Sequence, residues 1–359
     1  MARTHLWQAD VFDMVVESDR IRLEGLRLSN ASLEVHDTLD SQVAEWAICR
    51  NPMAKQDPSI MASTLTGLME GEDWEAFGTW VHYPWSNRLV RLLPEEAFIE
   101  VRTNRNRNKI SAEETAALRQ KTVGVVGLSV GQATAIALAM ERGCGRLKLA
   151  DFDVVELSNM NRIRCGLHEL DLPKWVVAAR TIAEFDPFVE VEPFDEGLSA
   201  ETMDAFLEGC DVVIDACDSL GMKAQLRMAC KSRLLPVVMD TNDRGMIDVE
   251  RYDVPALCGD GYLHGRIGED DMRAFAEMQG WTPEALQAFV DIEQASERGR
   301  ASLGQVGQTL VSWPQTYTGV AAGGAHAAEV CRRLLLGEDL PDARIYMDLN
   351  EQLTHAPLR

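Results

Sequence analysis

A glycine-rich turn after a short apolar run is the first feature of this sequence that could do chemistry. Val123–Val126 is wholly apolar and leads into Gly127-Leu-Ser-Val-Gly131, after which a helix is predicted from Ala133 to Met140. Backbone N–H groups at such a turn, together with the helix dipole, favour phosphate oxygens. Ser129 and Gln132 stand where the dinucleotide fingerprint G-x-G-x-x-G has its second and third glycines. The turn alone therefore indicates either an anion site or a plain tight connection.

Two carboxylates follow the next predicted strand, Arg146–Ala150. Asp151 ends this strand, and a carboxylate at that place can accept both hydroxyl protons of a ribose, in NAD sites and adenosine sites alike. Asp153 lies close enough to take this role instead. Either carboxylate could instead cap the turn that follows, and this alternative applies more to Asp153 than to Asp151.

Amide and cationic side chains come next, where a triphosphate would have a use for them. In Ser158-Asn-Met-Asn-Arg162, Asn159 can hydrogen-bond a phosphate and Arg162 can hold one bidentately. Lys174 follows Pro173, which suits the first position of a helix. A lysine there is unfavourable against the helix dipole, so we expect a local anion beside it, unless it is simply solvated.

Asp218 lies just past another predicted strand, Val212–Asp215. An acid at the carboxyl end of a strand that faces phosphates suits Mg²⁺. The alternative is that Asp218 caps the helix predicted to begin near Met222. The order of these groups at successive strand ends predicts that they meet in one crevice.

Alternating strands and helices must position these groups. From Lys121 onward the pattern predicts an α/β fold with a doubly wound, mostly parallel sheet, because buried parallel strands are short continuous apolar runs joined by helices. The predicted strands cover residues 123–126, 146–150, 189–193, 212–215 and 236–239, and the predicted helices cover 133–140, 176–185, 200–207 and 222–232.

Two domains are predicted. Residues 1–95 form an N-terminal accessory α/β region with a strand at 33–35 and helices at 39–48 and 60–69. Residues 96–359 carry the site and contain an irregular insertion at about 255–312, with a helix near 283–290. A helix rich in small residues closes this second domain at 319–336.

Taken in order, these motifs resemble the ThiF/MoeB/HesA superfamily of ATP-dependent activating enzymes, which are relatives of the ubiquitin-activating enzymes. The matching residues are Gly127, Asp151-Phe-Asp153, Leu157-Ser-Asn159-x-x-Arg162, Pro173-Lys174, Asp215-x-x-Asp218 and, upstream, Arg102-x-x-Arg105. Tyr83-Pro-Trp85 and Cys217-Asp-Ser-Leu220 are most similar to ThiF-like proteins of the nitroreductase-fused type, whose flavin domain this chain is expected to lack. The resemblance implies that residues 96–359 are an adenylation domain with the Rossmann-like activating-enzyme fold.

The resemblance also implies a reaction and roles. ATP and Mg²⁺ would serve the adenylation of a carboxylate, with release of pyrophosphate, in a biosynthetic or a peptide- or small-molecule-modifying pathway. Asp151 would contact the ribose, with Asp153 beside it, and Asp218 would hold Mg²⁺. Arg105, or in its place Arg102 or Arg107, would reach the ATP of a second subunit, which implies a homodimer with an arginine supplied across the interface. The phosphate contacts would come from Gly127, Ser129, Gly131, Asn159, Arg162 and Lys174.

Composition narrows the possible partners and the location. The chain has 35 Lys and Arg against 57 Asp and Glu, and a net charge of −22 argues against general nucleic-acid binding. No stretch approaches 18 apolar residues, so no membrane span is expected. The N-terminus has acids inside its first apolar stretch and does not have the pattern of a signal peptide, so we expect a cytoplasmic protein.

Two questions concern the role of the cysteines and the effect of the altered glycine turn. The eight cysteines form no C-x-x-C pair, so no structural zinc is expected. Cys258 lies in the expected insertion, and whether it carries a covalent intermediate is open. Because the glycine turn is altered, a non-catalytic nucleotide-binding partner protein is one alternative function. An NAD-dependent oxidoreductase is another, although the missing glycines and the added Arg162 and Lys174 count against it.

Overall fold

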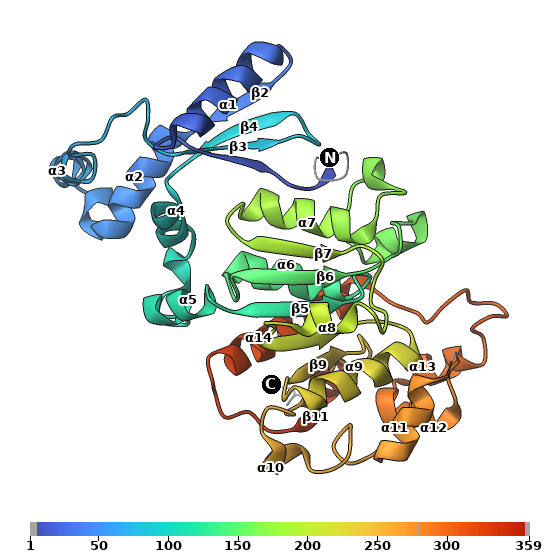
Figure 1. Cartoon of the computed structure of the whole chain (residues 1–359). Coiled ribbons are helices and arrows are strands. Elements are labelled where there is room, and N and C mark those ends of the chain that lie inside the picture. The colour runs from blue at the N-terminus through green and yellow to red at the C-terminus, as the bar shows by residue number, and fades with distance from the viewer. Residues whose placement is uncertain (1–5, 279, 356–359) are drawn as a thin grey trace. The chain divides into compact units, whose positions relative to one another are not determined.

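The computed structural model describes residues 6–278 and 280–355, and the chain divides into two compact units (Figure 1). Unit 1 comprises Met1–Ala112 with Ala183–Phe188, and unit 2 comprises Glu113–Ile182 with Val189–Arg359. The domain boundary predicted near residue 95 stays a prediction beside this division. Within the described ranges, no helix is long and apolar enough to cross a membrane.

Unit 1 is built on a four-stranded sheet with the order β1-β3-β4-β2. Strand β3 (Thr79–Tyr83) is buried along its whole length and pairs antiparallel with both of its neighbours. The helices predicted at 39–48 and 60–69 are confirmed as α2 (Leu39–Arg50) and α3 (Pro58–Leu68). The other elements are β1 (Asp10–Asp13), α1 (Glu17–Ser29), β2 (Glu34–Asp37), η2 (Pro52–Lys55), β4 (Arg88–Leu92), α4 (Glu95–Arg102) and η3 (Asn104–Asn106).

Unit 2 contains a seven-stranded sheet with the order β11-β10-β9-β8-β5-β6-β7, which confirms the predicted α/β class. Strands β5 to β9 run parallel, as the alternation of strands and helices predicts. Strands β10 and β11 extend one edge antiparallel and were not predicted. The strands are β5 (Thr122–Val126), β6 (Arg146–Ala150), β7 (Glu190–Phe194), β8 (Val212–Asp215), β9 (Val237–Asp240), β10 (Met246–Glu250) and β11 (Ala343–Tyr346).

Helices cover both faces of this sheet. Helices α6 and α14 pack together on one face, and α8 and α9 lie on the other (Figure 1). A Cβ added at Gly324 of α14 would lie 2.6 Å from Cβ of Ala133, so small residues let α14 and α6 approach closely. The helices before and after the insertion are α5 (Ala112–Leu118), α6 (Gly131–Glu141), η4 (Leu157–Asn161), η5 (Leu167–Glu169), α7 (Lys174–Phe185), α8 (Met203–Leu207), α9 (Leu220–Ser232), α14 (Tyr317–Leu335) and α15 (Leu349–Thr354).

The segment after β10 contains short helices where an irregular insertion was predicted. The predicted helix near 283–290 is confirmed as α12 (Pro283–Val290). Its Phe289 belongs to the buried core that α8, α9 and the sheet share. The other helices of this segment are α10 (Pro255–Cys258), α11 (Glu269–Ala276), η6 (Ile292–Gln294) and α13 (Glu297–Leu303).

The strand order reverses at β5, which has β6 on one side and β8 on the other. In open parallel sheets, ligands bind outside the carboxyl ends of the strands at such a reversal. The ends of β5, β6, β8 and β9 are therefore where a site is expected.

Candidate active site

The glycine turn after β5 has a backbone that favours glycine. Gly127 has a φ of +84°, and its N–H donates to the Ala150 carbonyl at 2.9 Å. An added Cβ would lie 2.5 Å from the Ala216 carbonyl oxygen. At Gly131, where α6 begins, an added Cβ would lie 2.7 Å from Cγ1 of Val125. The two glycines therefore let the turn and α6 lie close against β5 and the end of β8.

Asp151 follows β6 and is bonded to this turn. Its Oδ2 accepts the Leu128 N–H at 2.6 Å, and its Oδ1 accepts the Asp153 N–H at 2.8 Å. Asp151 is 7% exposed; burial raises the pKa of its carboxyl group, while the two backbone hydrogen bonds oppose that rise. Each carboxylate oxygen has room for a further hydrogen bond, so Asp151 can still accept a hydroxyl proton.

Arg162 connects the glycine turn to the segment after β6. Its Nε and Nη2 atoms donate to Ser129 Oγ at 3.2 and 2.9 Å, and Nη1 donates to Asn161 Oδ1 at 2.9 Å. Partial burial lowers the pKa of the guanidinium, and the negative charge of Asp218 opposes that shift. Three of the predicted site residues, Ser129, Arg162 and Asp218, therefore lie near one another at the edge of the sheet.

Lys174 has the anionic partner that its position at a helix start predicts. Its Nζ lies 2.7 Å from Oδ2 of Asp153, and its N–H donates to the Asp153 carbonyl at 2.9 Å. Lys174 is 6% exposed although it carries a charge. Asp153 is thus engaged with this lysine, and Asp151 is the carboxylate bonded to the glycine turn.

Two amide side chains hold the segment that carries Arg162. Asn159 is buried in η4, where its Oδ1 accepts the Glu156 N–H at 3.0 Å. Gln132 of α6 accepts the Arg164 N–H at 2.8 Å and donates to the Arg164 carbonyl at 3.3 Å. Gln132, which sequence reasoning noted only as a missing glycine, fastens this segment to α6. The predicted phosphate contact of Asn159 stays a prediction.

Arg105 lies in η3 of unit 1 and is exposed, whereas the other predicted site residues lie in unit 2. Its neighbour Arg102 donates through Nε to the Phe185 carbonyl at 3.1 Å, and Arg107 lies 3.7 Å from the Glu100 carboxylate. The contact of Arg105 with a second subunit's nucleotide stays a prediction.

A pocket of about 490 Å³ opens in unit 2 beside Asp218. Polar residues that follow β8 and β9 line one part of it, among them Cys217 and Asn242, and most of the apolar lining comes from residues 281–313. The Trp281 Nε1–H donates to the Asp218 carbonyl at 3.1 Å. The sequence did not predict this pocket, because residues 281–313, which form its apolar wall, come long after β8 and β9 in the chain.

Asp240 is a pocket residue that sequence reasoning also missed. It ends β9 and is 8% exposed, and its Oδ1 accepts the Asn242 N–H at 2.7 Å. Its Oδ2 is buried without a hydrogen-bond partner in the described part of the chain, and burial raises the pKa of Asp240 to about 7. The strand-end rule that selected Asp151 and Asp218 could have found it.

A buried ion-pair network lies under the polar part of the pocket. Lys223 Nζ lies 3.1 Å from both carboxylate oxygens of Asp215, and Arg227 contacts Asp215 at 2.5 Å and Glu250 at 2.6 Å. Burial alone would raise the pKa of Asp215, but the charges of Lys223 and Arg227 outweigh it and hold this pKa below its usual range. The network fixes the end of β8, from which Asp218 follows.

Neither Cys258 nor Cys217, the cysteine that follows β8, lies where a thiolate is favoured. Burial raises the pKa of Cys258, whose Sγ faces the Pro255 and Gly259 carbonyls. Burial and the adjacent Asp215 carboxylate raise the pKa of Cys217 well above its usual value. Because a nucleophilic cysteine reacts as the thiolate, these surroundings give neither residue the lowered pKa typical of a covalent carrier.

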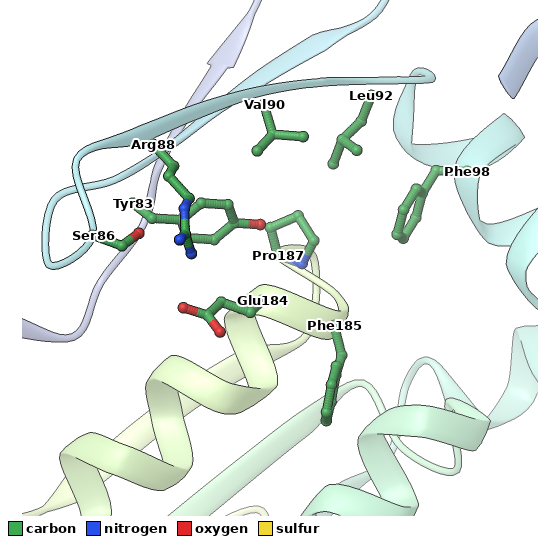
Figure 2. A pocket seen from close by; sticks show the side chains of 9 residues that line it. All are labelled: Tyr83, Ser86, Arg88, Val90, Leu92, Phe98, Glu184, Phe185 and Pro187. Atoms are coloured by element: carbon green, nitrogen blue, oxygen red, sulfur yellow. The ribbon is translucent and has the colours of Figure 1, made fainter. Parts of the chain in front are cut away.

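Unit 1 has a smaller pocket of about 240 Å³ that contains none of the predicted site residues. Figure 2 shows Tyr83, Arg88 and Glu184 around it, with Phe98 on its apolar side. The Tyr83 hydroxyl donates to the Ala183 carbonyl at 3.1 Å, so its polar end is engaged in holding the unit together.

Comparison with known proteins bears on the same region. The sequence profile of the ThiF family matches residues 103–242. A Mycobacterium tuberculosis protein, uncharacterized protein MT1398, is 40% identical over 346 residues, which cover 96% of this chain and 45% of that protein. The tRNA threonylcarbamoyladenosine dehydratase of Bacillus subtilis is 32% identical over 154 residues (42% of this chain, 60% of that protein). The molybdopterin-synthase adenylyltransferase of Haemophilus influenzae is 28% identical over 145 residues (39% and 58%).

The chain therefore spans about half the length of the relatives that it matches. The matched residues contain the glycine turn, Asp151, Arg162, Lys174 and Asp218, which are the groups that the fold gathers at the edge of the sheet. Residues 103–242 match the ThiF family, and this part of the chain supports the assignment to the ThiF/MoeB superfamily.

Proposed function

We propose that this protein activates a carboxylate by adenylation. A carboxylate oxygen attacks the α-phosphorus of ATP, the bond from that phosphorus to the bridging oxygen of the β-phosphate breaks, and pyrophosphate leaves with its electron pair. The observation that carries the proposal is the arrangement at the ends of β5, β6 and β8. There Asp151 is bonded to the glycine turn, Arg162 contacts that turn, and the negative charge of Asp218 acts on Arg162.

The physical problem of this reaction is charge. An anionic carboxylate must approach a triphosphate, and the leaving pyrophosphate gains charge, so fixed cations and positioning supply most of the catalysis. Arg162 is the cation that contacts the glycine turn, and Lys174 is held at 2.7 Å by Asp153, two residues after Asp151. We assign both to the phosphates, with the backbone N–H groups of residues 129–131, and Asp151 to the ribose.

Asp218 suits a metal ion that arrives with the nucleotide. The described residues contain no group of three His, Cys, Asp or Glu side chains placed to hold a metal by themselves. Mg²⁺ on a nucleotide needs only one or two protein carboxylates, because the phosphates and water supply its other ligands. The exposed carboxylate of Asp218 fits that requirement, and bound Mg²⁺ would neutralise part of the phosphate charge.

A homodimer with Arg105 supplied across the interface completes the proposal. Arg105 is exposed, so its guanidinium is accessible to another subunit.

The comparisons support adenylation. Residues 103–242 match the ThiF family, and the similar Haemophilus influenzae protein is an adenylyltransferase. A pathway that modifies a peptide or a small molecule is the setting we propose for it.

Pyrophosphate exchange tests the proposal. We expect wild-type protein to move radioactive pyrophosphate into ATP when Mg²⁺ and a suitable carboxylate are present. Lys174→Ala and Asp218→Ala should each reduce exchange at least about 100-fold, because each removes a charge that faces the reacting phosphates. Lys55→Ala and Asp260→Ala, at exposed positions outside the site, are the matched controls.

Binding measurements separate this function from the two alternatives. Thermal protection by NAD and not by ATP would favour an oxidoreductase. Protection by ATP without any release of AMP or pyrophosphate, across a broad set of carboxylates, would favour a non-catalytic partner protein. Unchanged ATP affinity in both Lys174→Ala and Asp218→Ala would count against the site itself.

A further inference from the structure

The pocket beside Asp218 has an apolar wall that comes from one segment of the chain. Residues 281–313 contribute Trp281, Leu286, Phe289, Leu303, Val306 and Trp313, and no charged side chain of this segment lines the pocket within the described residues. A volume of about 490 Å³ lies in the range of small-molecule sites, which are mostly apolar with a few polar groups.

The opposite part of the pocket is polar and lies next to the proposed nucleotide site. Cys217, Asp218 and Asn242 line it at the ends of β8 and β9, and the charge of Asp218 acts on Arg162. On the other side, Asn161 donates to the Gln315 carbonyl at 2.8 Å, and Gln315 also lines the pocket. The pocket therefore leads from the phosphate-binding groups into the apolar wall.

The wall is fastened in place before any ligand binds. Trp281 donates to the Asp218 carbonyl at 3.1 Å, and its ring meets the ring of Phe289 edge to face, with the centroids 6.0 Å apart. Phe289 is fully buried and stacks under the Arg227 guanidinium at 4.9 Å. A preformed apolar surface loses little conformational entropy when it takes up a ligand.

These features fix how a carboxylate substrate would lie. A carboxylate placed against tryptophan, phenylalanine and leucine side chains would lose its hydration without a partner, so it belongs at the polar end, where the cation Lys223 lines the pocket with Asp218 and Asp240. We propose that the carboxylate which this protein activates carries a large aromatic or branched aliphatic group close to the carboxyl group, and that the segment 281–313 selects it. This inference rests on the proposed adenylation.

A panel of acids tests the inference by pyrophosphate exchange. We expect 3-phenylpropanoate and 4-methylpentanoate to support exchange with a kcat/KM at least about 10-fold above that for acetate or succinate, since each added apolar group that fits a pocket gains roughly that factor. Short peptides that end in Phe or Leu, compared with peptides that end in Gly, distinguish a peptide terminus from a free acid as the source of the same chemistry.

A pair of matched variants ties the selectivity to the pocket. Val306 lines the pocket, whereas Val311 is 100% exposed in the same segment and does not line it. Val306→Trp should fill the pocket and reduce exchange with the bulky acid about 10-fold or more, while thermal protection by ATP stays unchanged. Val311→Trp should leave both unchanged. Calorimetric titration of 3-phenylpropanoate in the absence of nucleotide gives a second readout, in which Val306→Trp should weaken binding.

The outcomes are distinct. Absence of ATP binding would defeat the proposed function, and the titration would still decide whether the pocket takes the bulky acid. If ATP binds but exchange occurs only with acetate, succinate or peptides that end in Gly, the inference is wrong and adenylation stands. Equal exchange with the bulky acid by wild-type protein and Val306→Trp would overturn it as well.

Discussion

At the scale of single residues, Arg162 connects the glycine turn after β5 to the segment after β6. Two of its nitrogens donate to Ser129 Oγ, and the negative charge of Asp218 acts on its guanidinium. A phosphate is a better partner than a hydroxyl group, because hydrogen bonds between ionised groups are about twice as strong as neutral ones. We therefore expect Arg162 to give up its hydrogen bonds to Ser129 and to bind a phosphate group when a triphosphate enters the site.

Arg162→Lys tests this exchange of partners. The substitution keeps the charge but removes the planar fork that can hold a phosphate with two bonds, so ATP affinity should fall by about 10- to 100-fold. Calorimetric titration of ATP with Mg²⁺ measures the loss. Arg298→Lys, at an exposed position of α13, is the control and should bind ATP as the wild type does. Equal affinities of the two variants would contradict the role of Arg162.

The buried carboxyl group of Asp240 makes a prediction about stability. Its pKa is about 7 in the folded chain against an ordinary value of 3.8, so folding favours the protonated form. The cost of ionising it in the fold is absent below pH 3.8, grows as the pH rises, and is complete above about 7. Asp240→Asn should raise the unfolding free energy by roughly 2–4 kcal/mol at pH 8 and by less at pH 5.

Thermal unfolding of wild-type protein and Asp240→Asn at pH 5, 6, 7 and 8 measures this difference. Asp260→Asn, which changes an exposed acid, should follow the wild type at every pH. A gap between wild type and Asp240→Asn that stays constant with pH would show that the carboxyl group ionises normally.

At the scale of elements, the sequence predicts the strands that lie in the middle of the parallel sheet. Val123–Val126 and Val212–Asp215 lie within one residue of β5 and β8, because strands covered on both faces are continuous apolar runs. Strand β10 is also buried throughout, yet it carries Asp248 and Glu250. Their partners His264, Arg344 and Arg227 lie far away along the chain, so no local pattern marks this strand as buried.

The candidate site likewise has one part that the sequence predicts and another that it does not. Asp151 and Asp218 follow from the rule that parallel strands end at one edge, and Lys174 follows from the expected anion at its helix start. The apolar wall around Trp281 depends on how residues 281–313 fold back over the ends of β8 and β9, which is a tertiary contact. Sequence spacing therefore predicts the groups proposed for the nucleotide but not the pocket proposed for the acid.

Gly127→Ala tests the turn that begins the site. An added Cβ would lie 2.5 Å from the Ala216 carbonyl oxygen at a φ of +84°, so the turn must move or strain. We expect a loss of roughly 1–3 kcal/mol in unfolding free energy, measured in urea, together with weaker ATP binding. Gly25→Ala in α1, where nothing lies within 4 Å of the added atom, should instead stabilise the chain slightly. Equal stability of the two variants would show that the turn is not constrained.

At the scale of the whole molecule, the proposed site must attract a polyanion to a chain with a net charge of −22. The overall field repels ATP, so cations next to the phosphates have to offset it locally. Arg162 and Lys174 lie in unit 2, whereas Arg105 lies in unit 1 and is exposed. An arginine supplied by a second subunit would add a cation to each site without a change in the fold of either subunit.

Mixed dimers test whether Arg105 acts between subunits. Arg105→Ala and Asp218→Ala homodimers should each show pyrophosphate exchange reduced at least about 100-fold. In a heterodimer purified through two different tags, the site that retains Asp218 faces the subunit that retains Arg105, so about half of the wild-type rate per dimer should return, because a two-fold dimer has two equivalent sites. If Arg105 served its own subunit, neither site of the heterodimer would hold both residues and no exchange would return. A chain that is monomeric by analytical ultracentrifugation in the presence of ATP would contradict the arrangement outright.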